Sequence, residues 1–135
     1  MIARQAPSSL ERARDIARAA DEARALEIVV LEVGSLLPLC GCFVICHGRS
    51  PLHAEAIVER VRELLKEEGV VPHHREGPPR GEWLLLDYVD VVLHVFSEQS
   101  RRFYDLERLW ADAPRVEVEL VRRSVIPPAY EGELP

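Results

Sequence analysis

The sequence lacks the features that mark several large classes of protein. No apolar run reaches the roughly 18 residues that a membrane span needs, and the first residues have no apolar core of the signal-peptide type. There is no internal repeat, no low-complexity tract and no Gly-rich phosphate loop, since the Gly48-Arg49-Ser50 turn has a single glycine. We therefore expect a soluble, cytoplasmic protein without a membrane partner.

Positive charge is also scarce. Seventeen basic residues stand against 23 acidic ones, which gives a net charge of −6. The chain thus has no broad cationic field to attract a phosphate backbone. We expect no nucleic acid as the principal partner, whereas a basic protein would fit.

Cysteine is rare, and all of it lies in one short stretch. Cys40, Cys42 and Cys46 are an odd number of thiols, which suits a reducing compartment better than a disulfide framework. Thiolate and imidazole are zinc ligands, so these cysteines with His47 could form a metal or redox module. The Cys-x-Cys spacing is too tight for the usual zinc or redox motifs, which favours buried, inert thiols.

What the chain has is enough apolar residues, 47% of 135, to bury the core of one domain. The capping-box form of Ser8-Ser9-Leu10-Glu11, the position of Pro51 directly after the cap Ser50, and the period-two, period-3.6 and turn patterns predict the elements. The expected helices are about Leu10 to Ala25, a helix capped by Ser50 and ended at Gly69, and about Ser100 to Ala111. The expected strands are Leu26 to Val33, one around Phe43 to Ile45, Val70 to Arg75, Trp83 to Tyr88 and Val91 to Phe96.

This order predicts an α/β (α+β mixed) fold, in which helices pack against a mixed sheet of about five strands. The last two strands should form an antiparallel hairpin. We expect a flexible N-terminus over residues 1–9, the domain over 10–113 and a Pro-containing C-terminal tail over 114–135. Within that tail, the alternating residues 116–121 could add an edge strand, and Ile126-Pro127-Pro128 begins a loose segment.

Two acidic residues flank the predicted hairpin turn. Asp87 and Asp90 could hold a divalent metal in a nucleotidyltransferase-like enzyme. No third carboxylate in register and no phosphate loop accompany them, and Asp is a favoured turn residue. We therefore favour turn or surface roles over a metal site.

A histidine and several aromatic residues are concentrated in the last third of the domain. His94 lies on the strand face of Val92 and Phe96, where a hydrogen-bonded core or rim histidine is favoured over a catalytic base. Trp83 and Tyr88 lie at the two ends of their strand and Tyr104 lies off the helical stripe, so we expect these three to be exposed. Phe103 and Trp110 have the helical spacing of core residues.

Ordered segments of the chain from about Ala13 to Ala113 resemble the ribosomal silencing factors, also called the Iojap-related family. The segments that carry the resemblance include Phe43-Val44-Ile45, Gly48-Arg49-Ser50, Trp83-Leu84-Leu85-Leu86-Asp87-Tyr88, Asp90-Val91-Val92, His94-Val95-Phe96 and Tyr104-Asp105-Leu106-Glu107-Arg108-Leu109-Trp110.

The resemblance implies a fold like that of nucleotidyltransferases without their catalytic apparatus. It further implies a non-enzymatic protein, without cofactor or metal, that binds the large ribosomal subunit at its interface protein number fourteen. It would block small-subunit joining and repress translation under nutrient limitation, and the free protein would be a homodimer. The residues expected to form or support the docking surface are Trp83, Asp87, Tyr88, Asp90, His94, Tyr104, Glu107 and Trp110.

The chain departs from the family pattern at two places. Cys40-Gly41-Cys42 stands where the family usually has Ala-Asp and an aromatic residue, which would remove an acid and an aromatic ring from a binding surface. Val89 stands where the family usually has the glycine of an Asp-Tyr-Gly-Asp turn. Because a β-branched residue tolerates positive φ poorly, we expect this turn to be reshaped.

Overall fold

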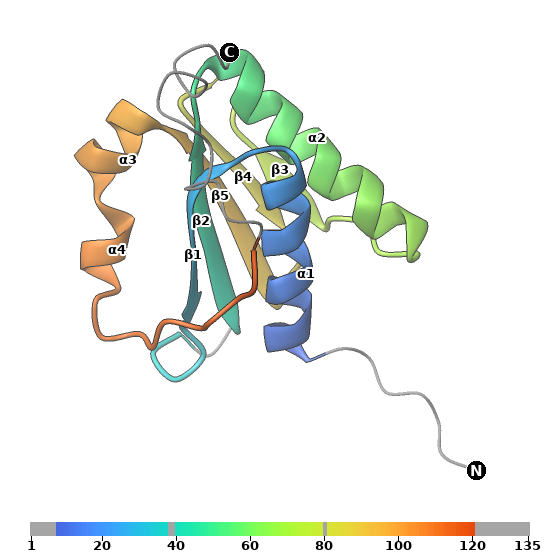
Figure 1. Ribbon diagram of the computed structural model, residues 1–135. Helices are drawn as coiled ribbons and strands as arrows, with labels where there is room; N and C mark the ends of the chain where they lie inside the picture. The colour runs from blue at the N-terminus through green and yellow to red at the C-terminus, as the bar shows by residue number, and fades with distance from the viewer. Residues whose placement is uncertain (1–7, 38–39, 80, 121–135) are drawn as a thin grey trace.

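The computed structural model describes residues 8–37, 40–79 and 81–120. One five-stranded sheet lies between two pairs of helices (Figure 1). The elements in chain order are α1 (Ser9–Glu22), β1 (Leu26–Glu32), β2 (Cys42–Gly48), α2 (Pro51–Glu67), β3 (His74–Glu76), β4 (Trp83–Asp87), β5 (Val91–Ser97), α3 (Glu98–Tyr104) and α4 (Leu106–Leu109). No helix within the described residues is long and apolar enough to cross a membrane.

The sheet is mixed, with the strand order β1-β2-β5-β4-β3. The central pair, β2 and β5, is parallel, and every other neighbouring pair is antiparallel. A parallel pair needs a crossover, which α2 supplies between β2 and the later strands. The predicted α/β class, the mixed sheet and the β4–β5 hairpin are confirmed.

The two long helices begin where their caps predict. The Ser8 side chain accepts from the Glu11 backbone N–H, and the Glu11 carboxylate accepts from the Ser8 backbone N–H, which completes a capping box. Ser50 caps α2 in the same way, and Pro51 occupies its first position, where no N–H is needed. Gly69 follows the end of α2 with φ of +80°, a conformation that favours glycine.

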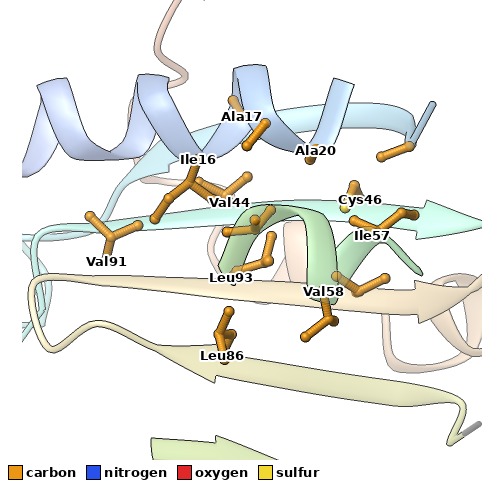
Figure 2. Close-up of a cluster of buried hydrophobic side chains, with 14 of the residues drawn as sticks. Ile16, Ala17, Ala20, Val44, Cys46, Ile57, Val58, Leu86, Val91 and Leu93 are labelled. Atoms are coloured by element: carbon orange, nitrogen blue, oxygen red, sulfur yellow. The ribbon is translucent and has the colours of Figure 1, made fainter. Parts of the chain in front are cut away.

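The main core lies between the sheet and the pair α1 and α2. Figure 2 shows Ile16 of α1 and Ile57 of α2 among the side chains of the central strands. Alanines at one face of α1 let the helix lie close to β2, and these alanines are almost fully buried. Burial of this apolar surface, worth about 25 cal/mol per Å², stabilises the fold.

The last predicted helix is divided in two, so the single helix from Ser100 to Ala111 is wrong. Asp105 adopts left-handed geometry with φ of +47°, and it ends α3 and begins α4. After the break, α4 lies on the same side of the sheet as α3, opposite α1 and α2, where Leu106 is buried and Trp110 partly buried. Phe103 was expected in the core with them but is 79% exposed, because it precedes the break.

Two strand predictions also need correction. The strand expected from Val70 to Arg75 is reduced to β3, because only these last residues reach the edge of β4. The described part of the expected strand at 116–121 forms no strand. Instead, Arg115 makes an isolated bridge with Leu31, and the Val116 N–H bonds the Val30 carbonyl. Val121 and the segment at 126–128 lie outside the described residues.

The β4–β5 turn is tight, and its backbone has a positive φ at Val89. Val89 has φ of +76°, and the Asp90 N–H bonds the Tyr88 carbonyl at 2.9 Å across it, which makes a γ-turn. The side chain of Asp87 accepts the Val89 N–H at 2.7 Å. A valine therefore occupies a backbone conformation that suits glycine.

Candidate binding face

Side chains of β4 alternate between the two sides of the sheet. Leu84 and Leu86 are fully buried in the cluster that packs against α1 and α2, whereas Trp83 belongs to the cluster beneath α4. Because strand side chains alternate, Leu85 and Asp87 share the side of Trp83, and all three are only partly buried. We call this side of β4 and β5, together with α3 and α4, the α3–α4 face (Figure 1).

A series of aromatic contacts joins the buried sheet to the surface of α3. The ring of Phe43 lies 4.7 Å from that of His94, which lies 5.9 Å from that of Trp83. Trp83 contacts Tyr104 at 4.8 Å, and Tyr104 contacts Phe103 at 5.1 Å. Exposure rises along the series from 5% at His94 to 52% at Tyr104 and 79% at Phe103. Buried rings thus support exposed ones.

The α4 side of the face has the same organisation. Trp110 is partly buried and packs edge-to-face on Phe43, with ring centroids 5.4 Å apart. Leu109, one residue earlier, is 75% exposed. A large apolar side chain is therefore presented to solvent beside a fixed aromatic one.

His94 supports this face from beneath. The Trp83 indole N–H donates to its Nδ1 at 3.2 Å, while Nε2 is buried without a hydrogen-bond partner among the described residues. Burial lowers the pKa of His94 to about 4, so the ring is neutral near pH 7. The prediction of a core histidine is confirmed, and His94 lies too deep to contact a macromolecular partner directly.

Glu107 is engaged within the protein. Its carboxylate accepts from Arg101 at 2.9 Å and from Arg115 at 3.4 Å, and its side chain is 24% exposed. Glu107 therefore belongs to the support of the α3–α4 face.

Tyr88 was expected in the exposed surface, and this is wrong. It is 4% exposed and belongs to the core cluster of α1 and α2, on the opposite side of the sheet from Trp83. Its hydroxyl is buried with no hydrogen-bond partner among the described residues, and burial raises the pKa of Tyr88 to about 12. The period of two places Tyr88 with Leu84 and Leu86, a signal that its nearness to the turn obscured.

Asp87 and Asp90 have separate turn roles. Asp87 caps the Val89 amide on the α3–α4 side, whereas Asp90 pairs with Arg12 of α1 at 3.4 Å. Asp90 thus lies toward α1 and outside the α3–α4 face, contrary to expectation. The described residues contain no group of three or more His, Cys, Asp or Glu side chains that could hold a metal.

The three cysteines are free, buried thiols, as the spacing favoured. Burial raises the pKa of Cys42 to about 11 and that of Cys46 to about 12, and it also raises the pKa of Cys40. A thiol is a nucleophile or metal ligand as the thiolate, so these groups are unreactive near neutral pH. Cys46 lies in the core beside Ile57 (Figure 2).

The sequence interpretation missed three members of the face, Leu85, Phe103 and Leu109, and one residue that supports it, Arg101. Leu85 could have been found from the alternation of β4. Phe103 and Leu109 were obscured because the break at Asp105 could not be foreseen, and the buried ion pair of Arg101 has no local sequence signal. The face therefore contains Trp83, Leu85, Asp87, Phe103, Tyr104, Leu109 and Trp110, supported by His94, Arg101 and Glu107.

A separate pocket of about 390 Å³ opens beside the C-terminal half of α2. Its walls are charged residues of α2 and two residues of the segment before β3: Glu59, Arg62, Glu63, Lys66, Val71 and Pro72. None of the residues predicted from the sequence to form the docking surface or a catalytic site lines this pocket. The pocket therefore gives no support to a catalytic role for Asp87 and Asp90.

Comparison with known proteins decides the family. Residues 6–133 match the family model described as "Ribosomal silencing factor during starvation". The chain belongs to the ribosomal silencing factor family. It is 38% identical to the ribosomal silencing factor RsfS of Halalkalibacterium halodurans over 75% of this chain and 86% of that protein. The corresponding protein of Bacillus subtilis is 36% identical over 76% and 87%.

Further members and solved structures agree with this assignment. The chloroplastic Iojap protein of Arabidopsis thaliana is 35% identical over 86% of this chain and 48% of that protein. An X-ray structure of a Chromobacterium violaceum protein superposes with a TM-score of 0.75 at 28% identity, covering 87% of this chain and 97% of that one. The family name describes a regulatory protein, and the resemblance seen in the sequence is confirmed.

The chain departs from the family pattern at Cys40-Gly41-Cys42. The last two of these residues, Gly41 and Cys42, lie away from the α3–α4 face. Cys42 belongs to the core cluster of α1 and α2, and a Cβ on Gly41 would lie 2.5 Å from the Cβ of Ser9 at the start of α1. Cys42 also receives a hydrogen bond from Ser9, which lowers its pKa slightly against the larger effect of burial. The glycine thus permits close approach of α1.

Proposed function

We propose that this protein docks through its α3–α4 face on the large ribosomal subunit, at interface protein number fourteen, and prevents the small subunit from joining. Translation would be repressed in the cytoplasm when nutrients are scarce. The mechanism is steric occlusion, so the protein acts without catalysis and without a cofactor. The family assignment supports a ribosomal role.

The single observation that carries the proposal is the exposed aromatic and aliphatic cluster on α3 and α4. Phe103, Tyr104 and Leu109 are each more than half exposed. Exposing a group of large apolar side chains to water is unfavourable in free energy unless a partner covers them. Trp83 packs against Tyr104, which packs against Phe103, and Trp110 beside Leu109 packs on Phe43 of the sheet, so these contacts pre-organise the cluster before binding. Pre-organised aromatic anchors lose little conformational entropy on docking, and such residues dominate binding energies.

Charge supports the choice of a basic ribosomal protein as the partner. The net charge of −6 attracts a basic surface at long range, which raises the rate of encounter. Affinity would come from the apolar cluster. We therefore expect high salt to slow association with the large subunit more than it changes dissociation.

Matched substitutions test the proposal. Tyr104→Ala and Leu109→Ser remove exposed side chains of the face, and each should weaken binding to isolated large subunits by about 10- to 100-fold. Leu52→Ser is the control, since Leu52 is 65% exposed at the start of α2, on the other side of the sheet. Equal affinity of all three folded variants and the parent protein would refute docking through this face.

The resemblance also implies a homodimer when the protein is free. We keep this as a proposal, which sedimentation equilibrium of the isolated protein tests. If dimer and ribosome use the same face, Leu109→Ser should weaken both associations and Leu52→Ser neither.

A further inference from the structure

Arg101 is the one arginine or lysine that is buried among the residues that the structure describes. It belongs to α3, it is 8% exposed, and its guanidinium points into the space between α3, β1 and β2. Burying a guanidinium is costly unless its donors are hydrogen-bonded. Its contacts therefore indicate what it holds together.

Three segments receive hydrogen bonds from Arg101. Its Nε donates to Glu107 of α4 at 2.9 Å. Its Nη1 donates to the Leu26 carbonyl of β1 at 3.3 Å and to His47 of β2 at 3.0 Å. Glu107 in turn accepts from Arg115, beyond α4. One side chain thus joins both short helices to two strands.

The contact with His47 fixes the state of that ring. An arginine only donates, so Nδ1 of His47 accepts and the ring proton lies on Nε2. Burial and the nearby Arg101 charge lower the pKa of His47, although the exposed carboxylate of Glu27 opposes them. A neutral His47 is therefore available to accept from Arg101 near pH 7.

The two helices need such an anchor. They have 7 and 4 residues, far below the length at which a helix is stable alone. Between them, Asp105 has φ of +47°, a strained conformation that persists where the surroundings hold it. Apolar contacts of Leu106 and Trp110 hold the α4 end, and Arg101 holds the bend.

We propose that Arg101, paired with Glu107 and His47, is a positioning residue that fixes the bend between α3 and α4 and so presents Tyr104 and Leu109 for docking. The effect of Arg101 on docking deepens the proposed function and rests on it. The effect of Arg101 on the bend concerns the free protein and does not depend on the proposed function. Arginine is required because its planar fork reaches three partners, which the single ammonium of lysine does not.

The test uses three changes at the network and one control. Arg101→Met keeps the aliphatic stem and removes the donors, and Arg101→Lys keeps the charge but not the fork. Glu107→Gln keeps an acceptor of similar shape and removes its charge, so it remains informative if the first variant folds poorly. Arg18→Met is the control, because Arg18 is an exposed arginine of α1, on the other side of the sheet, and pairs with Asp15 in the contacts described.

Two readouts separate the two parts of the idea. The chain has two tryptophans, Trp83 and Trp110, and both lie on the α3–α4 face, so acrylamide quenching of their fluorescence reports its order in the free protein. Affinity for isolated large subunits reports docking. We expect Arg101→Met and Arg101→Lys to raise quenching and to weaken binding at least tenfold. Glu107→Gln should raise quenching and weaken binding about threefold, and Arg18→Met should do neither.

Parent-like quenching and affinity in folded Arg101→Met, or in Glu107→Gln if the former does not fold, would overturn the proposal. So would a loss of affinity that merely follows the unfolded fraction measured by circular dichroism. If the parent protein itself fails to bind large subunits, the proposed function falls, and quenching alone then decides the positioning role.

Discussion

The indole N–H of Trp83 donates a 3.2 Å hydrogen bond to Nδ1 of the buried His94. This contact puts the ring proton of His94 on Nε2, in a buried environment that disfavours the charged form of the ring. It also fixes the tryptophan at the centre of the α3–α4 face. A polar contact in the core thereby sets the geometry of an exposed surface.

Acid should destabilise the protein through His94. Its pKa falls from about 6.5 in the unfolded chain to about 4 in the fold, so its contribution is complete above pH 6.5 and is lost as the pH falls toward 4. The loss is on the order of 3 kcal/mol. Urea midpoints measured across this range should decline less in His94→Phe. Parallel declines in the two proteins would contradict the role of His94.

Removing the hydroxyl of Tyr88 should stabilise the protein. The group is buried and unpartnered among the described residues, so Tyr88→Phe removes a desolvation cost and leaves the packing intact. We expect a gain of about 1 kcal/mol in the free energy of unfolding. Tyr88→Ala opens a cavity and should cost about 3 kcal/mol or more. Chemical denaturation of both variants checks the pair, and a loss in the phenylalanine variant would indicate a missed partner of the hydroxyl.

Val89→Gly should also stabilise the protein. Relief of the left-handed strain is worth about 1–2 kcal/mol, and the added freedom of the unfolded chain offsets about 0.5–1 kcal/mol of it. The matched control is Val71→Gly, at a valine that is similarly exposed but lies outside the residues with positive φ, and it should destabilise. Thermal unfolding of the two variants should move in opposite directions; a loss at both sites would show that Val89 is unstrained.

Gly41→Ala should destabilise by about 1–3 kcal/mol, because the new Cβ meets Ser9 and the Asp90 carbonyl. Adding Ser9→Gly removes the nearest atoms and should recover part of the loss in a double-mutant cycle. Gly34→Ala is the control, since its Cβ would have ordinary contacts at 3.6 Å. Additive effects of the two substitutions would contradict close packing of α1 on this glycine.

Local signals predicted the local parts of this structure well. The caps at Ser8 and Ser50, the proline at the start of α2 and the glycine after it depend on neighbouring residues alone, and the fold confirms them. The hairpin of β4 and β5 followed from two apolar runs with only two residues between them. These features predict the positions of β4 and β5, and therefore the part of the α3–α4 face that these two strands form.

The rest depends on contacts between distant segments. The bend at Asp105 is held by Arg101, whose partners lie 6, 54 and 75 residues away in the chain. No periodicity reveals such a network, so a continuous helix was the simpler interpretation and Phe103 was assigned to the core. Asp90 pairs with Arg12, which lies 78 residues away in the chain, so no local signal places its side chain toward α1.

The most direct test of the central claim is sedimentation of the purified protein with separated ribosomal subunits, followed by addition of small subunits. The account predicts that the protein migrates with the large subunit and reduces the amount of joined ribosomes. Leu109→Ser should lose both effects, while Leu52→Ser retains them. Absence of co-migration at low and moderate salt, or co-migration with undiminished joining, would contradict the account.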